Sequence, residues 1–448
     1  MSDMTATALK SAQGLDLSQI DDIQATVEAW RTPRGTQVRF VRRPELPMLD
    51  LVLQFKAGTS LDSDTSGVAA LTLHMLDKGT TRMDAAQFSE QIEGLGTQIG
   101  TEIRLEHSSV TMRSLTAPEL LTPAIELLTD MVAQPAFDPG QLARMKRQLQ
   151  PYQQGRYTLP QLRTRVEVHQ HLFAGHPYGT ALGTTPEGIE AATVGQLRAF
   201  HERAYSANNL QIAMVGDLTR EQAEAMVERI TQALPQHWAA AALPPVPQTA
   251  GKKIHVSLPG ASNAMVLAVP IDVQPGDPDF PALVLASEVL GSGLDSRLMR
   301  ELRAKRGLTY GASTRLSPHE AGGLLYIEWE IESAYIDASQ TLVAELLEQF
   351  IAEGPTQAEL DLARQQLAGD LLRKVARNRF LAALMAKAAQ QGLPADHINN
   401  YLHQLLAVTP DGVRTVLQSR LDVARKVLVS VGPAAEQQPL PYLPSTDQ

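Results

Sequence analysis

Histidine and carboxylate pairs are the first residues in this chain to weigh for chemistry, because they can hold metal ions or move protons. His74 lies three residues before Asp77, so the two share a helical face. His169 and His171 lie two apart, which places them on different faces of a helix. His176 lies in the turn-rich run GHPYG. We interpret all of these histidines as structural, because none has a second ligand at metal-binding spacing.

Other catalytic patterns are missing from the sequence. It has no G-x-S-x-G elbow and no glycine-rich loop ending in G-K-S/T. It also has no cysteine, which excludes disulfides, thiolate metal sites and a cysteine nucleophile. From the residues alone we predict no metal ion or other cofactor in this chain.

Composition describes an ordinary globular protein of more than one domain. The 448 residues are 44% hydrophobic and 20% charged, and the formal charge of −10 argues against a nucleic-acid partner. No apolar run reaches the roughly 20 residues that span a bilayer, so we expect no membrane association. Met1 to Gly14 lacks the pattern of an export signal. We therefore expect a cytoplasmic location, with the periplasm as the alternative if a signal peptide was removed.

The two halves of the sequence look like copies of one another. A proline-rich linker at 239–251 separates residues 1–238 from 252–448. Thr193 and Thr409 each begin a helical pattern, and Gly216 and Gly432 each end a strand pattern, both at an offset of 216 residues. Matching elements in the same order indicate an internal duplication.

Each half predicts strands joined by short connections, followed by groups of helices. Alternating or β-branched segments such as 49–55, 108–113 and 324–331 predict strands, whereas 118–133, 139–154, 159–173 and 356–375 predict helices. This pattern favours an α+β fold with two homologous domains, each a mostly antiparallel sheet with helices packed on it. Two such domains facing one another would form a clamshell around a cleft.

Two segments resemble the insulinase/pitrilysin family of inverted zincins, whose signature is H-x-x-E-H. The run HMLDKGT at 74–80 is similar to the end of that family's zinc helix. By this resemblance, Ala70 takes the place of the first zinc ligand and Leu73 that of the general base, which leaves only His74. The family's third ligand is a glutamate some seventy residues downstream, where this chain reads RMKRQLQ at 144–150. Those basic residues would repel a cation.

The second segment, LGSGLDSRLMRELRAKRGLTYG at 290–311, is similar to the family's C-terminal domain. In active members an arginine and a tyrosine seven residues apart reach across the cleft, and here they are Arg303 and Tyr310. A guanidinium can bind a peptide carbonyl, and a phenol can hydrogen-bond a developing oxyanion. Without the resemblance, Arg303 would be a solvated helix-end charge and Tyr310 a packed strand residue.

The resemblance implies a role without independent peptidase activity. Some bacterial members are heterodimers in which one chain carries the zinc motif and the other supplies the Arg/Tyr pair. We therefore expect a non-catalytic subunit that binds unfolded peptide and assists the transition state of a zinc metallopeptidase, with zinc in an H-x-x-E-H partner. Self-association of the chain without that partner stays open.

Two other readings compete with this one. The first is a pure scaffold or assembly subunit, like the core proteins of respiratory complexes that are related to this family. The second, which we rank last, is a self-sufficient peptidase that uses an unorthodox metal site at His74.

Overall fold

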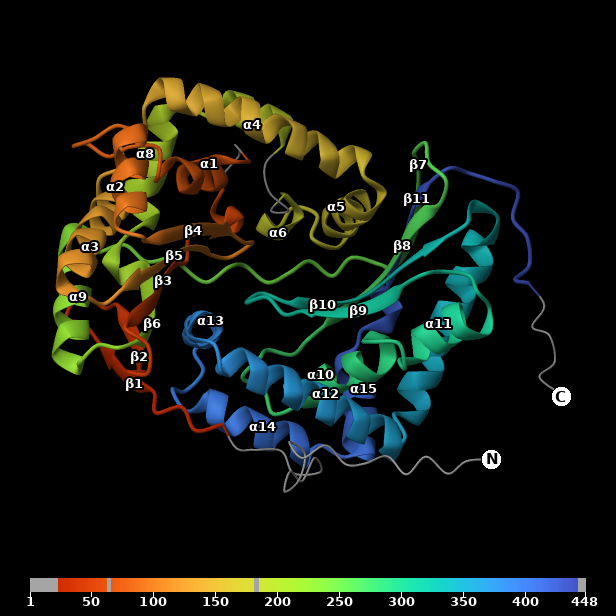
Figure 1. Ribbon diagram of the computed structural model, residues 1–448. Coiled ribbons are helices and arrows are strands. Elements are labelled where there is room, and N and C mark those ends of the chain that lie inside the picture. Colours follow the sequence, from red (N-terminus) through yellow and green to blue (C-terminus); the bar gives the residue numbers. More distant parts are fainter. Residues whose placement is uncertain (1–22, 63–65, 181–184, 442–448) are drawn as a thin grey trace, which may run out of the picture.

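The computed structural model describes residues 23–62, 66–180 and 185–441 (Figure 1). The first fourteen residues, on which the export-signal expectation depends, lie outside these ranges. The first half contains the following elements: β1 (Glu28–Arg31), β2 (Gln37–Arg42), β3 (Met48–Phe55), η2 (Thr59–Leu61), α1 (Val68–Met75), α2 (Ala85–Gly94), β4 (Gln98–Ile103), β5 (Ser108–Leu115), α3 (Pro118–Ala133), α4 (Pro139–Thr158), α5 (Pro160–Leu172), α6 (Pro177–Thr180), α7 (Pro186–Ala191), α8 (Val194–Ala204), η3 (Ala207–Asn209), β6 (Leu210–Gly216) and α9 (Arg220–Ala233).

The second half repeats much of this order. Its elements are β7 (Lys252–Ser257), β8 (Asn263–Ile271), α10 (Phe280–Gly291), the π-helix η4 (Met299–Lys305), β9 (Ala312–Ser317), β10 (Gly323–Ile331), η5 (Ser333–Tyr335), α11 (Ile336–Glu353), α12 (Gln357–Val375), α13 (Asn378–Gln390), α14 (His397–Ala407), α15 (Pro410–Arg420), η6 (Val423–Arg425) and β11 (Val427–Gly432).

Apart from β1, an extra edge strand of the first sheet, the two sheets have the same topology, which confirms the predicted α+β class with two homologous domains. The first sheet runs β1-β2-β6-β3-β5-β4 and the second runs β7-β11-β8-β10-β9. In both, one parallel pair (β2 with β6, β7 with β11) is followed by antiparallel pairs only. Thr193 and Thr409 both cap a helix with the side-chain oxygen, as their shared offset predicted.

The helix predictions were right in kind and less accurate at the ends. The structure places α3 at Pro118–Ala133, the range that was predicted. In contrast, α4 continues four residues beyond the predicted end, to Thr158, although Pro151 lies inside it. The segment from 239 to 251 contains no helix or strand. The domain limits drawn at this linker stay a prediction.

A helix from each half covers the sheet of the other half. Helix α13 packs on β3 and β6 of the first sheet, and α5 packs on β8 and β11 of the second (Figure 1). Their apolar side chains form two shared clusters. One joins Leu381, Met385 and Ala386 to Val52 and Val215, and the other joins Val168 and Leu172 to Val266, Tyr326 and Val429. The second face of each sheet is therefore buried by the other domain, which produces the clamshell.

Polar contacts reinforce this exchange. His169 on α5 hydrogen-bonds the Tyr178 carbonyl oxygen at 3.0 Å and the Tyr326 hydroxyl of β10 at 2.8 Å. Glu106 of the first half accepts hydrogen bonds from the Tyr178 hydroxyl and from the Glu320 backbone N–H of the second half. No helix in the described part of the chain is long and apolar enough to cross a membrane.

The buried His169 makes stability depend on acid. Burial lowers the pKa of His169 to about 4, although its bond to Tyr178 raises it. The folded state thus favours the neutral ring, and stability should fall as pH drops from about 6.5 toward 4, by a few kcal/mol for this one group. Urea unfolding between pH 7.5 and 4.5 measures the slope.

Two variants on α5 isolate the effect. His169→Gln should reduce the slope and leave the part that comes from His107 and His319, whose pKa values burial lowers to about 4 and about 3. His171→Gln, at a half-buried ring on the same helix, should keep the wild-type slope. Equal slopes in the wild type and in His169→Gln would contradict the assignment.

Candidate functional site

Helix α1, which carries the degenerate zinc motif, begins at a buried carboxylate. Asp62 accepts hydrogen bonds from the backbone N–H groups of Gly67 and Ala69, both at 2.7 Å. Burial raises the pKa of Asp62 to about 6, although both backbone bonds lower it. Gly67 has a φ of 117°, a conformation that other residues rarely adopt. This turn and the apolar run that follows place the helix in the core.

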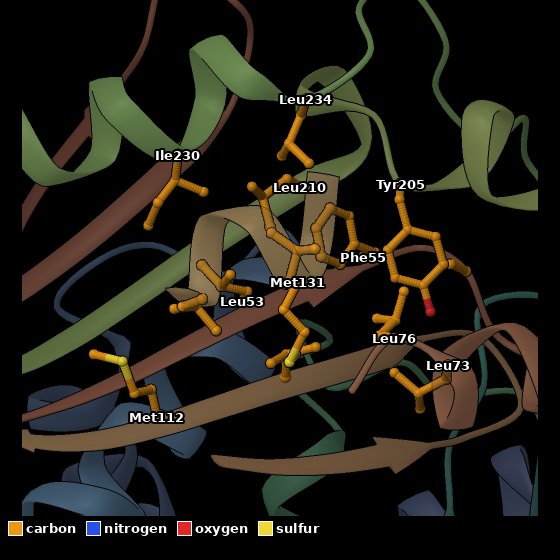
Figure 2. Close-up of a cluster of buried hydrophobic side chains, with 14 of the residues drawn as sticks. Leu53, Phe55, Leu73, Leu76, Met112, Met131, Tyr205, Leu210, Ile230 and Leu234 are labelled. Carbon is orange, nitrogen blue, oxygen red and sulfur yellow. The ribbon is translucent and has the colours of Figure 1, made fainter. Parts of the chain in front are cut away.

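The first-ligand and base positions have become part of that core. Ala70 is 6% exposed and Leu73 is fully buried. Figure 2 shows Leu73 in the same apolar cluster as Leu76 and Tyr205, on the core side of the helix. Neither side chain can bind a cation, and apolar side chains pack around both positions.

His74 keeps an ordinary helix position. Its ring is half-buried, and burial lowers its pKa more than the nearby Asp77 raises it. Asp77, the only acidic candidate beside it in the sequence, forms an ion pair of 2.9 Å with Lys78. Across the described ranges, no group of three or more histidines or carboxylates is placed to hold a metal ion. The residues present therefore do not fit a zinc ion.

Helix α4 is where the family would place its third ligand. It buries Leu142 and Met145, whereas Arg144 and Arg147 are exposed. A pocket of about 310 Å³ lies between α4 and α7. Its lining residues are Pro139, Leu142, Ala143, Lys146, Arg147, Gln150, Ile189 and Glu190. His74 is not among these residues. The zinc site is thus lost through missing ligands, and the predicted repulsion by basic residues is not needed to explain it.

His171, His176 and His201 also have structural partners. His171 and His176 hydrogen-bond the carbonyl oxygens of Ala250 and Pro244, both in the linker. His201 bonds the Val132 carbonyl oxygen at 2.8 Å. Together with His169, these rings stabilise local packing, as the sequence predicted.

The Arg/Tyr segment has a different character, because its two key side chains face water. Arg303 lies in η4 and is exposed, and Tyr310 is 94% exposed in the loop that precedes β9. Within the described residues, neither side chain has a hydrogen bond or ion pair. Tyr310 therefore does not pack in a strand, which was the structural alternative for it.

Neighbouring charges in the segment are paired, in contrast to Arg303. Lys305 and Arg306 both form ion pairs with Glu301. Hydrogen bonds from both lower the pKa of Glu301 more than burial raises it. Arg303 is thus the unpaired cation of η4. Arg306, the next arginine along the chain, is paired with Glu301 and is less available to a peptide.

The degenerate zinc motif and the Arg/Tyr segment lie in different domains. His74 belongs to the first domain and Arg303 and Tyr310 to the second, and no hydrogen bond or ion pair joins their side chains among the described residues.

Sequence reasoning missed the carboxylate that holds this segment. Glu359 at the start of α12 accepts two hydrogen bonds from Arg297 and one from Arg300. The available signal was the T-x-x-E capping box of Thr356 and Glu359, which the helix start alone already explained.

Comparison with known proteins agrees with this geometry. Residues 42–186 match the family model "Insulinase (Peptidase family M16)", and residues 191–367 match the "Peptidase M16 inactive domain" model. A crystal structure of a peptidase M16 inactive domain from Pseudomonas fluorescens superposes with a TM-score of 0.89 at 33% identity, covering 93% of this chain and all of that one. The chain belongs to the insulinase (M16) peptidase family.

Other M16 relatives include proteins with and without a peptidase description. A "Non-peptidase homolog YmxG" of Helicobacter pylori is 25% identical over 388 residues, covering 84% of this chain and 87% of that one. An "Uncharacterized zinc protease" of Mycobacterium leprae is 23% identical over 397 residues, covering 84% of both chains. With Ala70 and Leu73 in the motif, this chain is an inactive homologue within the M16 family.

Rebuilding the base position should damage the fold rather than restore chemistry. Leu73→Glu places a carboxylate in an apolar cluster, and we expect it to lower the free energy of unfolding by about 3 kcal/mol or more. Leu73→Met keeps size and polarity and should cost less than about 1.5 kcal/mol. Urea unfolding with and without zinc measures both. A Leu73→Glu protein of normal stability that gains zinc affinity would contradict the core assignment.

Proposed function

We propose that this chain is the metal-free subunit of a two-chain zinc peptidase that degrades unfolded peptides. Its partner would be an M16 chain with an intact H-x-x-E-H motif, which supplies the zinc ion. Two observations together carry the proposal: Arg303 and Tyr310 are exposed and unpaired in the second domain, and the degenerate zinc motif of the first domain is part of its core. Burying an arginine and a tyrosine without hydrogen-bond partners would cost free energy. In water, both side chains keep their donors available for a peptide.

The two side chains suit a peptide in different ways. The guanidinium of Arg303 has five N–H donors and no acceptor, so it can bind peptide carbonyl oxygens. The hydroxyl of Tyr310 can donate to the scissile carbonyl oxygen and stabilise the charge that develops there. Both groups would act in trans, on a peptide held at the partner's site.

We expect the peptide to pair as an extra strand with a sheet edge of the partner, and not with the edge strand β9 of this chain's second sheet. At the edge strand β9, the Ala312 N–H donates to the Met299 sulfur at 3.2 Å. Gly291 approaches Thr314 so closely that a Cβ would lie 2.6 Å from its backbone nitrogen. The outer edge of β9 is thus covered by its own domain, which supports peptide pairing with a sheet edge in the partner.

The remaining partner and compartment assignments follow from charge and composition. A net charge of −10 favours neither nucleic acid nor an anionic membrane as a partner. We assign the chain to the cytoplasm, with the periplasm as the alternative, and no cofactor of its own. Self-association without the partner belongs to the same proposal.

A scaffold role is the second candidate function. The description of the Helicobacter pylori relative as a non-peptidase homologue favours it. In that case Arg303 and Tyr310 would be surface residues without an effect on turnover, and the chain would serve assembly alone.

Tyr310→Phe in the reconstituted pair separates the two candidates. Removing only the hydroxyl should lower kcat on the order of 100-fold, as for other donors to a developing oxyanion, with assembly unchanged. Tyr152→Phe, at another exposed tyrosine, is the matched control and should leave kcat unchanged. Peptide cleavage and gel filtration measure turnover and assembly. Normal turnover of Tyr310→Phe in an intact pair would favour the scaffold.

A further inference from the structure

The Arg/Tyr segment poses a problem of position. The side chains of Arg303 and Tyr310 have no hydrogen bond or ion pair to hold them, yet the proposed function needs them at fixed places over a peptide. Displacing such groups by about 1 Å can cost on the order of 100-fold in rate. Their positions must therefore come from whatever fixes the backbone that carries them.

Buried side chains anchor the inner face of that backbone. Leu298 and Leu302 lie in the core of the second domain, and the Leu308 N–H donates to the Leu302 carbonyl oxygen at 2.8 Å. These apolar contacts hold η4 against the domain, but they are non-directional and leave its rotation weakly set. A π-helix is also rare, and π-helical turns often occur at functional sites.

Directional contacts come from one carboxylate on a different helix. Arg297, just before η4, donates to Glu359 through Nε at 3.0 Å and through Nη2 at 2.7 Å. Arg300, within η4, donates to the same carboxylate at 2.5 Å. Such two-pronged arginine–carboxylate pairs fix geometry as well as supply energy.

Glu359 is itself held firmly. It accepts a hydrogen bond from the Thr356 N–H at 2.9 Å in the capping box that begins α12. Arg297 also donates to the Gly354 carbonyl oxygen and lies 4.7 Å from the centre of the Phe350 ring. Burial raises the pKa of Glu359, but hydrogen bonds from Arg297, Thr356 and Arg300 lower it to about 2, so the carboxylate stays ionised.

We propose that Glu359, through Arg297 and Arg300, is the positioning residue that sets η4 and thereby the places of Arg303 and Tyr310. This inference rests on the proposed function and adds a residue to it. Glu359 touches no substrate. It acts by fixing the segment to the corner between α11 and α12.

The test uses Glu359→Gln with Asp361→Asn as its matched control. Glutamine can keep the capping-box contact to Thr356, so the change is confined to the charged contacts with the arginines. Asp361 lies on the same helix and contacts Arg364 and Gln357, which both belong to α12 as well. Both variants exchange a carboxylate for an amide.

Two measurements read the effect. Hydrogen exchange of residues 299–311 in the chain alone should become faster in Glu359→Gln and stay at the wild-type rate in Asp361→Asn. With the H-x-x-E-H chain and a quenched fluorogenic peptide, Glu359→Gln should lower kcat about ten-fold and change KM by less than about two-fold. If Glu359→Gln does not fold, Arg297→Lys replaces it, because lysine keeps the charge and loses the two-pronged contact.

The outcomes separate this inference from the function on which it rests. Wild-type exchange and kcat in Glu359→Gln, with a reduced kcat in Arg303→Ala, would overturn the positioning role and leave the proposed function standing. A normal kcat in both Arg303→Ala and Tyr310→Phe would overturn the proposed function, and the positioning role with it.

Discussion

The central strands of both sheets are buried on both faces, and that constraint determines the rest of the architecture. The helices of one domain can cover only one face. The other face of the first sheet is buried by α13, and that of the second sheet by α5. Because burial of apolar area is the main favourable contribution to folding, neither domain is complete without the other. The exchange therefore holds the two domains of the clamshell together.

This arrangement explains how the chain could lose zinc chemistry without losing its fold. Helix α1 is buried along nearly its whole length, so most of its side chains belong to the core of the first domain. Leu73, at the position where the family has its base, adds apolar area to that core. A buried carboxylate there would need zinc or another partner to offset its desolvation. Once the ligands were absent, an apolar residue became the more stable choice.

The second domain shows the opposite balance. It has an apolar core of its own, but Arg303 on the π-helix η4 and Tyr310 in the loop that follows remain in water. One ionised carboxylate, Glu359, adds charge-assisted hydrogen bonds to the apolar contacts of that segment. By the proposed positioning role, these bonds would fix the backbone of the segment while the side chains of Arg303 and Tyr310 stay free to bind.

Local sequence patterns predicted the elements and the fold class well. Pro118 at the start of an amphipathic run gave α3 its observed limits, and strand alternation gave most of both sheets. The exchange of α5 and α13 could not be predicted, because an apolar helix face does not say which sheet it covers.

The same limit applied to the site. The absence of ligands at Ala70 and Leu73 could be read directly from the sequence, whereas the hydrogen bonds from Arg297 to Glu359 could be found only in the tertiary structure. Residues 62 positions apart meet there only after α11 has folded back.

The central claim is that catalysis needs both chains, and peptide cleavage by this chain alone, by its H-x-x-E-H partner alone and by their mixture tests it most directly. The account predicts turnover only in the mixture, with a rate that saturates as the two chains approach equal amounts. Full activity from the partner alone would contradict it and reduce this chain to a scaffold.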